Sequence, residues 1–83
     1  DRSVPAVLNG ANEAVVESYL IGHLRFVDIA NLLETVMSGF YSLYQKPDCP
    51  EYLKNIHSLE DAVRADQWGR DEAQRLLLKR DAA

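Results

Sequence analysis

The stretch DIANLLETVMSGFYSLY, from Asp28 to Tyr44, carries the clearest structural signal in the chain. Its apolar residues recur at steps of three and four, which places them on one face of an α-helix. The members of this stripe are Ile29, Leu32, Leu33, Val36, Met37, Phe40, Leu43 and Tyr44. Asp28 is a favourable N-cap residue, and Pro47 ends the pattern because proline lacks the amide hydrogen that a continuing helix needs. We therefore predict a helix that begins at Asp28 and ends before Pro47.

A second helical segment precedes this one. Asn9 can cap its start by accepting the amide hydrogen of Asn12, and Gly22 can end it in a left-handed conformation. At about 100° per residue, Asn12 falls near the middle of the apolar stripe. Because an unbonded buried carboxamide costs about 1–3 kcal/mol, we predict that Asn12 is buried and hydrogen-bonded to backbone. With Asn9, it would tie the preceding segment or the following connector to the helix start.

The last third of the chain predicts a short helical turn around residues 51–56 and a third main helix. Ser58 can cap this helix, with Asp61 at the capping-box position. Asp66 interrupts the stripe, so we predict a break near Asp66, which would cap a new helix. Trp68 lies off the stripe and is expected on an exposed, interface-forming face. The stripe itself is Leu59, Ala62, Val63, Arg70, Ala73, Leu76 and Leu77.

These segments predict an all-α fold, a small helical bundle with three main helices, the last one broken. No alternating run or hairpin dipeptide predicts a strand. The 83 residues suffice for one small domain, but not for a nucleotide-binding domain plus a catalytic one. Hydrophobic residues make up 47% and charged residues 27%, which is typical of a folded chain rather than a disordered one.

Charge and composition argue against several partners. The net charge of −4 and the absence of a clustered basic surface disfavour nucleic acid. No apolar run approaches the roughly 20 residues of a membrane span. Cys49 has no partner for an intramolecular disulfide, which fits a reducing, cytosol-like compartment. The chain begins at Asp1 rather than Met, and we expect it to be a piece of a longer protein.

No motif in the chain predicts a reaction. His23 and His57 each lie beside a predicted helix end without a second ligand at metal-binding spacing. Cys49 has no base nearby in the sequence. Neighbouring carboxylates such as Asp71 and Glu72 diverge by about 100° around a helix and are typical of helix starts. We therefore assign no catalytic, cofactor-binding or metal-binding residue, and only structural ones: Asn9, Asn12, Gly22, Asp28, Ser58 and Asp66.

Two stretches resemble the C-terminal domain of 1-deoxy-D-xylulose 5-phosphate (DXP) reductoisomerase. AVLNGANEAVVESYLIGHLRFVDIANLLETVM, residues 6–37, is similar to that family's L-N-A-A-N-E box, apolar helix ending at glycine and F-x-D-I motif. SLEDAVRADQWGRDEA, residues 58–73, is similar to its S-L-E-D-V-x-x-A-D-x-x-A-R segment. Gly10 and Gly69 stand where alanine is usual, and residues 38–57 form a longer stretch than usual. Gly10 is expected to weaken the first helical turn by up to about 1 kcal/mol.

The resemblance implies a function for the whole enzyme. Members of the family convert DXP to 2-C-methyl-D-erythritol 4-phosphate, in non-mevalonate isoprenoid biosynthesis, with NADPH and a divalent metal (Mg or Mn). The residues that hold these groups lie upstream of the segment that this chain resembles. Residues 1–83 are therefore expected to form a non-catalytic C-terminal helical-bundle domain that is inactive alone, without the catalytic and NADPH-binding domains.

The resemblance also implies partners. The expected partner is the catalytic domain of the same polypeptide, within a homodimeric parent enzyme in the cytoplasm or, in a eukaryote, in the plastid stroma. The alternative hypothesis is a free-standing helical module for protein–protein interaction.

Overall fold

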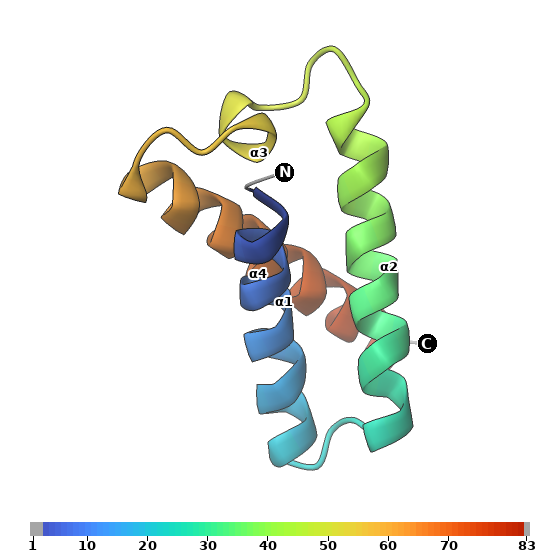
Figure 1. The fold of residues 1–83 in the computed structure, drawn as a ribbon. Coiled ribbons are helices and arrows are strands. Elements are labelled where there is room, and N and C mark those ends of the chain that lie inside the picture. Colours follow the sequence, from blue (N-terminus) through green and yellow to red (C-terminus); the bar gives the residue numbers. More distant parts are fainter. Residues whose placement is uncertain (1–2, 83) are drawn as a thin grey trace.

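The computed structural model describes residues 3–82, and these residues form four α-helices and no β-strand (Figure 1). The helices are α1 (Ser3–Leu20), α2 (Phe26–Tyr44), α3 (Glu51–Lys54) and α4 (Leu59–Ala82). The prediction of a small all-α helical bundle is confirmed. The helical turn predicted around residues 51–56 corresponds to α3, which is shorter than that range.

The helices α1 and α2 form an antiparallel pair, and α4 crosses this pair on one side (Figure 1). The most extensive helix contact is between α1 and α4, and the contact between α1 and α2 is smaller. The short helix α3 packs on α4 and on the N-terminal part of α1, where the Ser3 hydroxyl donates a hydrogen bond to the carbonyl oxygen of Leu53. On the side of the α1–α2 pair that faces away from α4, residues 3–82 place no helix (Figure 1).

Two clusters of buried side chains form the core. The first joins α1, the α1–α2 connection, α2 and α4, and its buried members are Ala11, Ala14, Val15, Leu24, Leu32, Val36 and Ala73. The second lies at the other end of the bundle, near α3, and its buried members are Val7, Phe40, Cys49, Leu53 and Ala65.

Trp68 of α4 connects the two clusters. Its half-buried side chain packs against both of them, and its ring meets the Phe40 ring edge-on at a centroid distance of 6.0 Å. The prediction that Trp68 lies on an exposed interface face is therefore wrong. The face of α4 that packs inward carries Ala65, Trp68 and Ala73, whereas Leu59 and Val63 of the predicted stripe are exposed.

The end of α1 confirms the role predicted for Gly22. Its φ of 83° lies in the left-handed region, which side chains disfavour. The Gly22 amide donates to the carbonyl oxygen of Tyr19, and the His23 amide donates to that of Ser18, both at 3.0 Å. These two bonds make a Schellman motif, which satisfies carbonyls that the end of a helix leaves without partners.

The predicted starts of α1 and α2 are wrong. α1 begins at Ser3, so Asn9 lies in its interior. The helix can include Pro5 because Pro5 falls in the first turn, where backbone amides have no hydrogen-bond partner within the helix. α2 begins at Phe26 with Arg25 as its N-cap residue, and Asp28 lies in the first turn instead of capping it. The Asp28 carboxylate binds the Arg25 guanidinium at 3.0 Å, and it also benefits from the positive end of the helix.

The third predicted start is correct, but the predicted break is not. The Ser58 hydroxyl accepts the Asp61 amide hydrogen at 3.1 Å, and the Asp61 carboxylate accepts the His57 amide hydrogen at 3.0 Å. In a standard capping box the Asp61 carboxylate would accept the amide hydrogen of the cap residue Ser58, and here it accepts that of the preceding residue, His57. α4 then continues through Asp66 without a break. The Asp66 carboxylate accepts a hydrogen bond from the Asn9 amide at 2.7 Å, so α1 supplies its partner and the helix need not open.

Candidate functional site

The crossing of α1 and α4 is built on two buried glycines, one from each helix. A β-carbon on Gly10 would lie 1.8 Å from the carbonyl oxygen of Asp66, and one on Gly69 would lie 2.0 Å from that of Val7. Both distances are far below van der Waals contact, and both opposing atoms are backbone. The two helices therefore approach to a distance that alanine at either position would prevent. Gly10 lies beyond the first turn of α1, so the expected weakening of that turn does not apply.

A row of polar contacts runs beside this crossing. Besides the bond from Asn9 to Asp66, the Arg70 guanidinium of α4 reaches Glu13 at 3.2 Å and Glu17 at 3.4 Å on α1. Burial alone would lower the pKa of Arg70, but its hydrogen bonds to Glu13 and Glu17 outweigh this effect and raise that pKa. Arg70 therefore stays charged and holds the two helices in register. Sequence reasoning placed Arg70 in the apolar stripe and missed these ion pairs, although Glu13 and Glu17 are spaced to share one helix face.

Asn12 lies on the opposite flank of α1 and is exposed, so the prediction that it is buried is wrong. Its side chain makes no hydrogen bond to any residue that the structure describes. The buried face of α1 is formed by Val7, Gly10, Ala11, Ala14 and Val15, which pack toward α4. Asn12 falls just outside this face, next to an open groove that it lines with Pro5, Leu8, Asn9 and Leu33.

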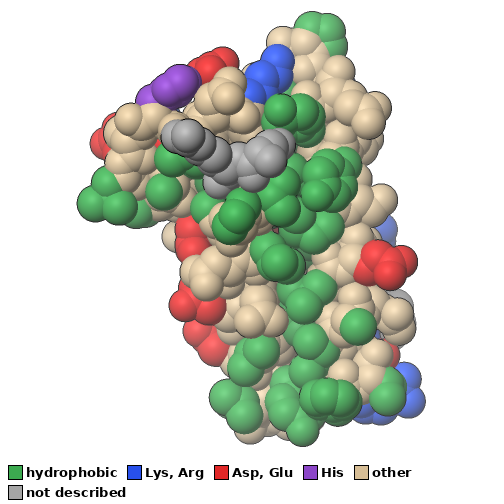
Figure 2. Space-filling model, viewed as in Figure 1, with side chains coloured by type: hydrophobic (Ala, Val, Ile, Leu, Met, Phe, Trp, Pro, Cys, Tyr) green, Lys and Arg blue, Asp and Glu red, His purple; other side chains and the backbone are tan. Residues whose placement is uncertain are grey.

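The groove continues along an apolar band between α1 and α2 (Figure 2). At the end near the α1–α2 connection, the Tyr19 and Phe26 rings meet edge-on at a centroid distance of 5.8 Å. The Phe26 side chain is 70% exposed, and those of Leu8 and Tyr19 are 39% and 37% exposed. We define the groove face as Pro5, Leu8, Asn12, Tyr19, Phe26 and Leu33.

The other candidates from the sequence do not converge on one site. Cys49 is buried in the second cluster, and burial raises the pKa of its thiol, which disfavours the thiolate that a nucleophile needs. His57 is exposed and lies 3.5 Å from Glu51, and His23 is exposed in the α1–α2 connection. Tyr52 accepts a cation–π contact from Arg64 at 5.7 Å. Within residues 3–82, no three His, Cys, Asp or Glu side chains form a group that could hold a metal ion.

None of the helices in the described part of the chain is both long enough and apolar enough to cross a membrane.

Comparisons with known proteins give consistent matches. A family profile described as the DXP reductoisomerase C-terminal domain matches residues 1–72. Among curated proteins, the chain is similar to 1-deoxy-D-xylulose 5-phosphate reductoisomerases. It is 35% identical over 76 residues to that of Geotalea daltonii, 37% over 76 residues to that of Citrifermentans bemidjiense, and 41% over 70 residues to that of a Cyanothece species. No solved structure matches significantly.

These matches cover most of this chain but a small part of each relative. They include 92%, 92% and 84% of the chain, in the same order, and 17%, 17% and 16% of the relatives. The chain therefore spans about a sixth of the length of the curated proteins that it resembles.

Proposed function

The chain belongs to the DXP reductoisomerase C-terminal domain family, and from this premise we propose that residues 1–83 are the non-catalytic helical-bundle domain of a 1-deoxy-D-xylulose 5-phosphate reductoisomerase. The observation that carries the proposal is the family match over residues 1–72, together with the small share of each relative that the chain covers. A free-standing interaction module gains no support, because each relative named above carries this region within a much longer chain.

The reaction that we assign to the whole enzyme is the conversion of DXP to 2-C-methyl-D-erythritol 4-phosphate, with NADPH and Mg or Mn. We assign the cofactor, metal and substrate sites to the remainder of the polypeptide. A dinucleotide site needs a glycine-rich turn at the start of a helix. The four glycines here lie singly instead: Gly10 and Gly69 are at the helix crossing, Gly22 ends α1, and Gly39 lies inside α2.

The role that we assign to the domain is support of the catalytic domain of the same polypeptide. The close α1–α4 crossing and the Arg70 ion pairs supply a rigid pair of helices, which suits a scaffold. We place the whole enzyme, as a homodimer, in the cytoplasm or in the plastid stroma of a eukaryote.

A truncation tests the proposal. The longer polypeptide that carries residues 1–83 is compared with a version that ends before residue 1, by NADPH-dependent turnover of DXP. We expect the truncated version to lose at least about tenfold in turnover, because its supporting contacts are gone. Undiminished turnover would overturn the proposal. As a control, Asp71→Asn, which changes an exposed carboxylate of α4, should leave kcat unchanged.

Ligand titration tests the division of labour. The 83-residue chain is titrated with NADPH and, separately, with Mn²⁺, and binding is followed by calorimetry and amide chemical shifts. We expect no saturable binding in the micromolar range, because converging oxygen ligands are what such metals require. Saturable micromolar binding of either ligand would show that the chain contributes a site and would contradict a purely supporting role.

A further inference from the structure

We propose that the groove face receives an apolar segment from the upstream part of the same polypeptide, with a main-chain peptide group of that segment hydrogen-bonded to the Asn12 carboxamide. This inference rests on the proposed function and deepens it, because it names the surface through which the domain meets the rest of the enzyme.

The first argument is the apolar surface that the bundle leaves uncovered. Pro5, Leu8, Asn12 and Tyr19 follow one another on α1 at steps of three, four and seven, so they form a second stripe beside the one that α4 buries. Phe26 and Leu33 lie on α2, also seven residues apart, which keeps them on one helix face. A continuous exposed apolar band on a domain of this size is typical of a binding surface (Figure 2).

The second argument is the polar group within that band. The Asn12 carboxamide offers one acceptor and two donor hydrogens, and it has no partner among the residues that the structure describes. A purely apolar occupant would cover this group and leave it unsatisfied. A peptide group, which presents one donor and one acceptor, matches both sides of the carboxamide. The occupant is therefore a segment of polypeptide whose backbone is accessible at one point.

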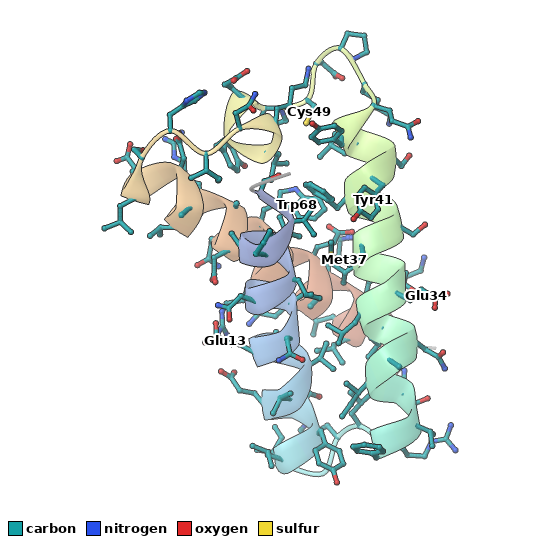
Figure 3. The ribbon with its side chains drawn as sticks, viewed as in Figure 1. Glu13, Glu34, Met37, Tyr41, Cys49 and Trp68 are labelled. Carbon is teal, nitrogen blue, oxygen red and sulfur yellow. The ribbon has the colours of Figure 1, made fainter. Side chains whose placement is uncertain are left out.

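The third argument concerns the identity of the occupant. Glu34 lies on the outer side of α2, whereas Glu13, on the outer side of α1, is paired with Arg70 of α4 (Figure 3). A second copy of the chain would carry the same net charge of −4 as the first, so pairing of two groove faces is disfavoured. The relatives contain about five times as much additional chain as this domain, which supplies a covalently attached occupant at high effective concentration.

Site-specific photo-crosslinking identifies the occupant. A benzophenone amino acid replaces Leu8 or Phe26 in the longer polypeptide, and Leu59, which is 83% exposed on the first turn of α4, provides the matched control. We expect Leu8 and Phe26 positions to give adducts with an upstream segment of the same chain, at a yield at least about tenfold above that of the Leu59 position. Adducts of twice the chain mass would assign the groove to a second copy. Equal adduct yields at the groove and Leu59 positions, or no adducts at all, would show that nothing docks in the groove. Each of these results overturns the inference.

A pair of asparagine variants tests the hydrogen bond. Asn12→Leu removes the carboxamide from the groove, whereas Asn31→Leu makes the same change on the exposed opposite face of α2. In the longer polypeptide, we expect Asn12→Leu to raise hydrogen exchange of the groove-lining amides about fivefold, as one lost hydrogen bond implies, and Asn31→Leu to leave it unchanged. Equal exchange in the two variants would overturn the assigned bond.

The outcomes separate this inference from the proposed function. If truncation abolishes turnover but the groove positions give no intrachain adduct, the domain supports the enzyme through another surface, and only the docking site is wrong. If truncation leaves turnover unchanged, the proposed function fails, whatever the adducts show.

Discussion

Single residues set how closely α1 and α4 approach. Gly10 and Gly69 each face a backbone carbonyl of the other helix, so their missing β-carbons are part of the contact. Glycine is unfavourable inside an isolated helix by about 1 kcal/mol relative to alanine. The close approach offsets this cost by burying backbone against backbone, where dispersion contacts are dense.

Substitution of Gly10 tests this balance. We expect Gly10→Ala to lower the free energy of unfolding by about 1–3 kcal/mol, because the new β-carbon forces the helices apart despite the better helix propensity of alanine. Gly39→Ala is the matched control: its β-carbon meets no atom within 4 Å, so it should raise stability by about 0.5–1 kcal/mol. Urea denaturation of the 83-residue chain measures both. Stabilisation by both variants would show that the crossing tolerates a methyl group.

Residues whose roles were predicted wrongly share one cause. A helical wheel shows which residues lie on one face, but not where on that face the partner helix packs. For Asn12 the difference decides between a buried and an exposed carboxamide, and for Asn9 and Asp66 it converts two predicted caps into one hydrogen bond between helices. The groove face could not be predicted for the same reason, since it exists only because α4 takes the neighbouring face of α1.

At the scale of whole elements, the ends of helices were more predictable than their starts. Gly22 and Pro47 act through their own stereochemistry, so their effect can be recognised locally. Cap residues are common in any polar sequence, and only competition among them decides which one is used. Ser58 caps α4 as predicted, whereas the Asp28 carboxylate binds Arg25 and Arg80 instead.

The role of Asp28 at the start of α2 predicts a dependence on pH. The hydrogen bond from Arg25 lowers the pKa of Asp28 below its ordinary value of 3.8. A carboxyl group with a lowered pKa in the folded state stabilises the protein above its unfolded-state pKa, and this contribution is lost as the pH falls through the folded-state value. The Asp28 contribution should therefore be complete at neutral pH and disappear in acid.

Comparison with an amide variant isolates this contribution. We expect Asp28→Asn to be less stable than the unsubstituted chain at pH 7, and the difference to shrink as the pH falls through the lowered folded-state pKa of Asp28. Asp48→Asn is the control, because Asp48 is exposed and forms no ion pair with the residues that the structure describes. Thermal melts across this pH range give the result. A stability difference that persists at low pH would mean that Asp28 acts through packing and not through its charge.

At the scale of the whole molecule, Trp68 decides whether the bundle unfolds as one unit. The two core clusters lie at different ends of the bundle, and Trp68 packs against both. Small domains bury only a small apolar surface. A side chain that packs in both clusters therefore contributes strongly to the cooperativity of unfolding. The sequence predicted the class of fold from the stripes of the separate helices, but the position of Trp68 depends on how α4 crosses the pair.

Unfolding followed by two probes tests this cooperativity. We expect helical circular dichroism and Trp68 fluorescence to give the same midpoint in urea, because the fluorescent residue belongs to both clusters. Trp68→Ala should lower the free energy of unfolding by about 2–3 kcal/mol. This is less than the about 3–5 kcal/mol expected for a fully buried tryptophan, because the Trp68 side chain is half-buried. The variant should also have a lower urea m-value, because the two clusters would unfold separately. Leu59→Ala, on an exposed side chain, should change stability by less than about 0.5 kcal/mol. Two distinct midpoints in the unsubstituted chain would show that the clusters unfold independently and that Trp68 does not join them.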